Sequence, residues 1–234
     1  MIKYKDMEEA PPAYSTVHPA QKVPESSHNS AAVSNTYEIY NTTTGLDVTN
    51  SGRQIYYLGR YNAPTSPDIL AYGGYDHNGP WLAQADFRLV EKSLRVYLGG
   101  LKHPAKDDWD TVRHSTEGHI FHTDFFRFEV LDHSSTKRKL HWTKTRDRKL
   151  GASRLSIRDH KLVDEGSEDV VAVYTEHNLG MADTLKGRLV FHQRLGDNAE
   201  LAALVVVIAV NERLRRYTKQ IAVAFPAAGG GGAG

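Results

Sequence analysis

A short proline and tyrosine motif near the N-terminus has the residue types and spacing of a peptide ligand. Pro11, Pro12 and Tyr14 form a PPxY sequence. Consecutive prolines preset the polyproline II conformation, so little entropy is lost on docking, and the tyrosine ring adds a second anchor. Because PPxY sequences bind WW domains, the predicted partner is a WW-domain protein such as a HECT-type ubiquitin ligase. The alternative is a chance match in a proline-bearing tail.

A basic segment in the second half of the chain predicts contact with phosphate groups. Residues 137–149 (KRKLHWTKTRDRK) contain seven Lys or Arg residues and one Asp. Alternate residues of a strand share a face, so part of these charges would converge on an anionic lipid headgroup such as a phosphoinositide. The predicted anionic-lipid residues are Lys137, Arg138, Lys139, Lys144, Arg146, Arg148 and Lys149. The alternative is an edge strand whose charges prevent edge-to-edge pairing. Nucleic acid is not expected, because Trp142 is the sole aromatic residue of the segment apart from His141.

The remaining polar residues do not form a recognisable catalytic or metal-binding motif. The closest histidine group is His114, His119, His122 and Asp124. On a strand, His119 and His122 would face opposite sides, and the chain has no HExxH sequence. A G-x-S-x-G sequence and the phosphate-binding glycine loops are also missing. We therefore predict no catalytic residue, no metal and no cofactor, and we expect a non-enzymatic protein.

Composition limits the classes of protein further. The 234 residues carry a net charge of +1 and include no cysteine. Thiolate chemistry, disulfides and cysteine-based zinc sites are therefore excluded, and no overall electrostatic attraction to nucleic acid is expected. The first residues lack the apolar core of a signal peptide. We expect a soluble cytoplasmic protein that can also lie peripherally at membranes.

The longest segment that is apolar on every side is residues 200–216 (ELAALVVVIAVNERLRR), which contains ten consecutive apolar residues. Asp197 and Glu200 have the spacing of a capping box, with Asp197 as N-cap. Basic residues that suit the negative end of a helix dipole follow the apolar run: Arg213, Arg215 and Arg216. We predict one helix from about Asn198 to about Tyr217. Ten residues rise only about 15 Å, half of a bilayer core, which favours a buried core helix over a membrane span.

Before this helix, the chain consists of short segments of alternating apolar residues between Gly, Asn, Asp and Pro clusters. The predicted strands are residues 54–61, 68–72, 81–90, 93–98, 117–121, 125–131, 139–143, 152–157, 161–163, 170–175 and 185–191. A late helix that is apolar on all sides needs walls on all sides, which an open sheet does not provide. The prediction is a mainly β fold: a closed antiparallel β-barrel of about 12 strands around one central C-terminal helix.

The ends of the chain differ in composition from this domain. Residues 1–34 hold four prolines and no periodic apolar pattern, which is typical of a disordered arm. Residues 227–234 are mostly glycine, as in a flexible tail. The predicted barrel domain is therefore 35–226.

Over most of residues 54–216 the order of several segments resembles the tubby C-terminal-like superfamily, in particular its fungal branch, which is related to LURP-one-related proteins and phospholipid scramblases. These segments are IYYLGRYNAPTSPDIL (55–70), WLAQADFRL followed by LRVYLGG, HWTKTRD (141–147), GASRLS (151–156), and KLVDEG (161–166) followed by VVAVYT. The resemblance implies a 12-stranded barrel with a central hydrophobic helix. Tubby itself binds phosphoinositides, and scramblases act on membrane lipid. The cysteine cluster that scramblases palmitoylate has no counterpart here.

Together these observations predict an adaptor or binding module with a WW-binding arm and a barrel that contacts phosphoinositide or other anionic membrane surfaces. The alternative is a lipid-handling, scramblase-like protein.

Overall fold

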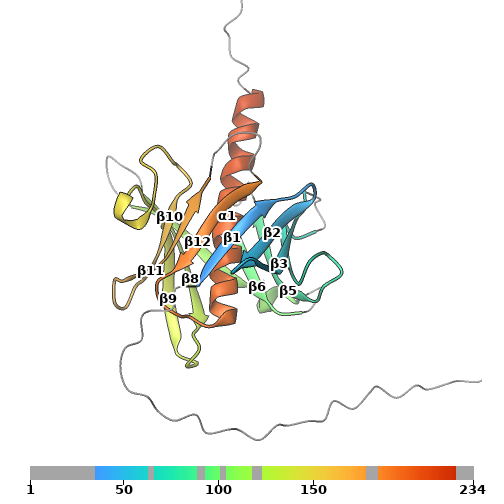
Figure 1. Cartoon of the computed structure of the whole chain (residues 1–234), viewed down its shortest axis with the longest axis horizontal. Coiled ribbons are helices and arrows are strands. Elements are labelled where there is room, and N and C mark those ends of the chain that lie inside the picture. The colour runs from blue at the N-terminus through green and yellow to red at the C-terminus, as the bar shows by residue number, and fades with distance from the viewer. Residues whose placement is uncertain are drawn as a thin grey trace, which may run out of the picture. The chain divides into compact units, whose positions relative to one another are not determined.

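The computed structural model describes residues 35–62, 66–88, 93–100, 104–117, 123–177 and 184–224. These residues form twelve strands, two short 3-10 helices and one α-helix (Figure 1). The strands are β1 (Thr36–Asn41), β2 (Gly45–Asn50), β3 (Arg53–Arg60), β4 (Ile69–Gly73), β5 (Trp81–Arg88), β6 (Ser93–Leu98), β7 (Asp110–Glu117), β8 (Thr123–Leu131), β9 (Lys137–Lys144), β10 (His160–Asp164), β11 (Val170–Glu176) and β12 (Leu185–Phe191). The helices are η1 (Lys106–Asp108), η2 (Arg148–Leu150) and α1 (Asp197–Ala224).

The twelve strands form one closed antiparallel barrel. Each strand pairs with its neighbours in sequence, and β1 closes the barrel by pairing with β12, where Tyr37 lies opposite Leu189. Closure leaves no free sheet edge in the barrel, so edge protection does not explain the charges of β9, which pairs with both β8 and β10. The predicted fold class is confirmed.

Helix α1 fills the barrel. All ten residues from Leu201 to Val210 are at most 5% exposed, as expected for a helix that is surrounded by strands. The indole nitrogen of Trp142 on β9 donates a hydrogen bond of 3.1 Å to the carbonyl oxygen of Ala203, inside the core. The helix ends at Ala224, later than the predicted end near Tyr217. No helix among the described residues is long and apolar enough to cross a membrane.

The N-terminal end of α1 is held by a buried carboxylate. Glu200 is 1% exposed and accepts hydrogen bonds from the Tyr37 hydroxyl (2.6 Å), the Asn35 amide (2.9 Å) and the Leu195 backbone N–H (3.3 Å). The Glu200 N–H donates to the Gly196 carbonyl, which makes Gly196 the residue that flanks the helix. The prediction of Asp197 as N-cap is therefore wrong, because the helix already begins at Asp197. The Glu200 side chain does not complete a capping box but joins the helix to β1.

The other end of the barrel is joined to α1 by Arg216. Its guanidinium pairs with Asp68 at 2.5 Å, donates to the Tyr61 carbonyl, and lies 4.8 Å from the centre of the Phe87 ring. Glu212, which is buried, accepts from Arg216 at 3.0 Å. Through one side chain, these contacts fix the helix against the residues that follow β3 and precede β4, and against β5.

Several predicted elements differ from the structure. Residues 152–157, predicted as a strand, form part of the loop between β9 and β10. The strand predicted at 117–121 lies mostly outside the described residues, and the preceding segment, which was not predicted, forms β7. No bounds were predicted for β1 and β2. The predicted arm (1–34) and tail (227–234) lie outside the described residues.

Candidate membrane-contact surface

The two predicted binding sites fall in different parts of the chain. Pro11, Pro12 and Tyr14 lie outside the described residues. The basic segment 137–149 is described completely and covers β9 and the first part of the loop that follows it. We call residues 145–159 the β9–β10 loop. The seven predicted lipid-binding residues are therefore divided between a strand and a loop.

The four basic residues of β9 do not converge. Lys137 and Lys144 stand at opposite ends of the strand, seven residues apart, which corresponds to about 23 Å. Side-chain direction also alternates along β9, so Arg138 belongs to the inward side with the buried Leu140, whereas Lys139 is exposed. A single headgroup cannot contact this set of charges.

Three of these four residues are already paired with carboxylates. Lys137 pairs with Glu129 on β8, and this ion pair lowers the pKa of Glu129. Arg138 pairs with Asp164 on β10 at 2.5 Å. Lys144 lies 3.5 Å from Asp124. Burial raises the pKa of Asp164, but the Gly166 amide and Arg138 outweigh that effect and hold this pKa below its usual value. The charges of β9 thus mainly serve contacts between strands.

The β9–β10 loop carries the unpaired part of the predicted patch. Arg146, Arg148 and Lys149 are exposed, and so is Arg154, which is not among the seven predicted residues. Among the described residues, none of these four side chains forms an ion pair. The acidic residues of the loop are Asp147, which is exposed, and Asp159, which is 1% exposed. Four cations thus face solvent beside one exposed carboxylate.

Hydrogen bonds within the loop fix its backbone. The Asp147 side chain accepts from the Lys149 N–H at 2.9 Å and begins the η2 turn. Gly151 ends this turn with φ of 80°, a left-handed conformation that favours glycine. Asp159 accepts from the Ser153 N–H (2.7 Å), the Ser156 hydroxyl (2.8 Å) and the Glu176 N–H on β11 (2.8 Å). The loop therefore presents its cations from a defined scaffold.

The loop lies at the end of the barrel from which the C-terminal part of α1 projects, and it is the yellow segment in Figure 1. Arg158 of the same loop turns back to the barrel and pairs with Glu176 at 3.1 Å. It is therefore part of the attachment of the loop rather than of its exposed charge.

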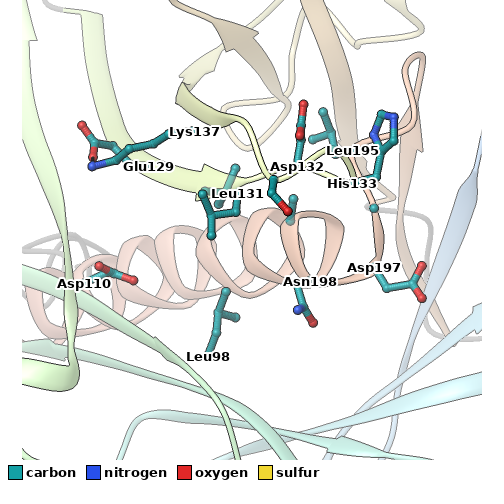
Figure 2. A pocket seen from close by; sticks show the side chains of 14 residues that line it. Leu98, Asp110, Glu129, Leu131, Asp132, His133, Lys137, Leu195, Asp197 and Asn198 are labelled. Carbon is teal, nitrogen blue, oxygen red and sulfur yellow. Dashed lines mark ion pairs between the residues drawn. The ribbon is translucent and has the colours of Figure 1, made fainter.

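The opposite end of the barrel holds a cavity of about 800 Å³ around the first turn of α1 (Figure 2). Its apolar lining includes Leu98, Leu131 and Leu195. Its polar lining includes four carboxylates, one lysine and one histidine: Asp110, Glu129, Asp132, Asp197, Lys137 and His133. The lysine is paired with Glu129, so carboxylates dominate. This cavity would repel an anionic headgroup, and the loop at the other end would attract one.

The histidine group of the sequence is only partly described. His119 and His122 lie outside the described residues, whereas the His114 imidazole lies 3.0 Å from the Asp124 carboxylate and stacks on Phe126. In the part of the chain that the structure describes, no three His, Asp or Glu side chains are placed to hold a metal ion.

Comparisons of the chain with protein-family models, with curated proteins and with solved structures gave no match. The structure itself establishes a closed 12-stranded antiparallel barrel with one helix, which agrees with the barrel that the tubby-like resemblance implies.

Proposed function

We propose that this protein is a non-enzymatic binding module that attaches to anionic membrane surfaces through its β9–β10 loop and recruits a WW-domain protein through its N-terminal arm. The observation that carries the membrane part is a set of four exposed cations on one fixed loop that have no ion-pair partner among the described residues. Each Lys or Arg near an anionic bilayer surface contributes about 1 kcal/mol, so four contribute roughly 4 kcal/mol. That energy is sufficient for reversible attachment and too small for permanent anchoring.

Charge at the two ends of the barrel supports one orientation at the membrane. The β9–β10 loop is basic, whereas the lining of the cavity at the N-terminal end of α1 is mainly acidic. An anionic surface would attract the first and repel the second. Anionic lipids are concentrated in the cytoplasmic leaflet, so a protein that uses this surface belongs in the cytoplasm.

Membership in the tubby C-terminal-like superfamily is part of the proposal. It is supported by the order of the resembling segments and by the closed 12-stranded barrel around an apolar helix. A fold alone does not carry an activity, so the phosphoinositide preference of tubby is a hypothesis to be measured here.

Vesicle co-sedimentation tests the membrane part. The full chain is mixed with phosphatidylcholine vesicles, with vesicles that also contain phosphatidylserine, and with vesicles that contain a phosphoinositide at the same total charge. We expect binding to both anionic compositions that weakens as salt is added, because surface charges are screened. A further gain with phosphoinositide at equal charge would indicate headgroup recognition. Equal sedimentation with neutral and anionic vesicles would exclude the proposal.

The WW-binding part rests on the sequence of Pro11, Pro12 and Tyr14. A peptide that spans Glu8 to Val17 should bind WW domains of HECT-type ubiquitin ligases with a micromolar dissociation constant. Tyr14→Ala removes the second anchor and should abolish that binding. Unchanged affinity of the substituted peptide would show that the PPxY sequence is a chance match, and the membrane part would stand independently.

A further inference from the structure

Two large apolar side chains are exposed close together in the β9–β10 loop. Leu155 is 93% exposed and Ile157 is 60% exposed. Between them, Ser156 is buried and its hydroxyl donates to Asp159. Leu155 and Ile157 therefore both point away from the barrel. Other large apolar residues that are exposed, such as Tyr75 and Leu131, stand singly in the described part of the chain. Single exposed apolar residues are common, whereas an adjacent pair indicates a contact surface.

This exposure is fixed by the structure of the loop. The backbone N–H of Ser153 and the hydroxyl of Ser156 both donate to the buried Asp159. Ala152 is 4% exposed, and its N–H donates to the Asp147 carbonyl oxygen at 3.2 Å. Ala152, Ser156 and Asp159 thus turn inward, while Leu155 and Ile157 turn outward. The arrangement is the reverse of the one that burial of apolar surface would favour in an isolated domain.

The surroundings of the pair are cationic. Arg154 directly precedes Leu155, and the other exposed cations of the loop are Arg146, Arg148 and Lys149. Apolar side chains flanked by Lys and Arg are typical of protein segments that lie in the membrane interface, where the apolar groups enter the acyl boundary and the cations contact phosphates. A protein partner would require about 800 Å² on each side, which is far more than one loop tip provides.

We propose that Leu155 and Ile157 insert into the membrane interface, so that the β9–β10 loop is an amphipathic anchor rather than a purely electrostatic contact. This inference rests on the proposed membrane function and specifies its mechanism. Insertion supplies binding that salt does not screen, because transfer of apolar surface from water is independent of charge. Leu155→Ser with Ile157→Ser should raise the dissociation constant for anionic vesicles at least tenfold.

Site-directed fluorescence tests insertion directly. The chain has no cysteine, so Leu155→Cys and Ile157→Cys each provide a single attachment point for an environment-sensitive dye such as NBD. The matched control is Tyr75→Cys, which is 68% exposed and follows β4 at the end of the barrel away from the loop. With vesicles of phosphatidylcholine and phosphatidylserine, we expect a blue shift and increased emission at positions 155 and 157, and neither change at position 75.

The possible outcomes separate this inference from the function on which it rests. If the protein sediments with anionic vesicles while dyes at 155 and 157 stay in an aqueous environment, insertion is excluded and electrostatic attachment stands. If the protein does not sediment at all, both the proposed membrane function and the inference are excluded. A blue shift without vesicles that grows with protein concentration would assign the pair to contact between two copies of the chain, which also overturns insertion.

Salt dependence gives a second measurement. The wild-type chain should retain part of its vesicle binding at high salt, and the Leu155→Ser, Ile157→Ser variant should lose that part while it still binds at low salt. Both residues are exposed, so the variant should fold normally, which its unfolding transition verifies. Identical salt profiles for the two proteins would contradict insertion.

Discussion

Val206 lies at the middle of the apolar part of α1 and is 1% exposed, while Val205 and Val207 on either side are fully buried. We expect Val206→Asp to destabilise the whole barrel, because the new carboxyl would sit in a core in which every residue from Leu201 to Val210 is apolar. Ionisation there is unfavourable, so the folded protein would keep the carboxyl protonated.

The free-energy cost can be worked out from the pH. Keeping a carboxyl with a normal pKa of about 3.9 protonated at pH 7 costs about 4 kcal/mol, at 1.36 kcal/mol per pH unit. Burial of the neutral polar group adds roughly 1–3 kcal/mol. The total of about 5–7 kcal/mol is comparable to the stability of an ordinary domain. At pH 5 the cost of keeping the carboxyl protonated falls to about 1.5 kcal/mol. The difference in unfolding free energy between wild type and Val206→Asp should therefore shrink by roughly 3 kcal/mol.

The assay is urea unfolding of wild type, Val206→Asp and Val206→Asn at pH 5 and pH 7. Asn has nearly the size of Asp but does not ionise, so its cost should be the same at both pH values. A Val206→Asp variant that loses less than about 1 kcal/mol, or whose loss does not depend on pH, would show that this face of α1 is not inside the barrel.

Two further predictions concern buried polar groups. His160 is fully buried, its Nδ1 lies 2.7 Å from the Arg158 carbonyl oxygen, and burial lowers its pKa to about 4. The unfolded chain therefore binds more protons than the folded chain between about pH 6.5 and 4, so stability should fall by about 3 kcal/mol as the pH drops through that range. His160→Asn should flatten this part of the profile in urea titrations, and a wild-type profile that is already flat would contradict the buried neutral imidazole. Glu200→Ala leaves the buried Tyr37 hydroxyl without its acceptor and should cost about 3 kcal/mol. Tyr37→Phe in the Glu200→Ala background should then cost much less than in wild type, and purely additive effects in this double-mutant cycle would argue against the bond.

The sequence predicted the elements whose pattern is local. Residues 201–210 are apolar on every side, so the helix had to be surrounded by protein in all directions. A closed barrel of strands is the arrangement that provides this. Strand β6 was predicted with its observed bounds, because Leu94 and Val96 alternate with polar residues and face the core. Strand β7 was missed because in its eight residues only Val112 is buried, which leaves no alternation to detect. Its place is set by pairing with β6 and β8.

The candidate site was predicted less completely. The basic segment was recognised, but convergence of its charges assumed a geometry that β9 does not provide, since most of its cations pair with carboxylates of β8 and β10. Residues 152–157 were predicted as one of the short strands with alternating apolar residues. Ser153, Ser156 and Asp159 instead bond to each other locally, and such side chains compete with strand pairing. The spacing of Ser153, Ser156 and Asp159 was the sequence feature that could have indicated a loop here.

The central claim is that the cations of the β9–β10 loop, rather than those of β9, hold the protein at anionic membranes. The most direct test compares two doubly substituted chains that lose the same charge: Arg148→Ala with Lys149→Ala in the loop, and Lys137→Ala with Lys139→Ala on β9. On vesicles that contain phosphatidylserine, the loop variant should bind about 2 kcal/mol more weakly, or roughly 30-fold. The β9 variant should bind within about threefold of wild type. Equal losses for the two variants would show that binding depends only on net charge and not on the position of the cations. A larger loss for the β9 variant would place the membrane contact at the other end of the barrel.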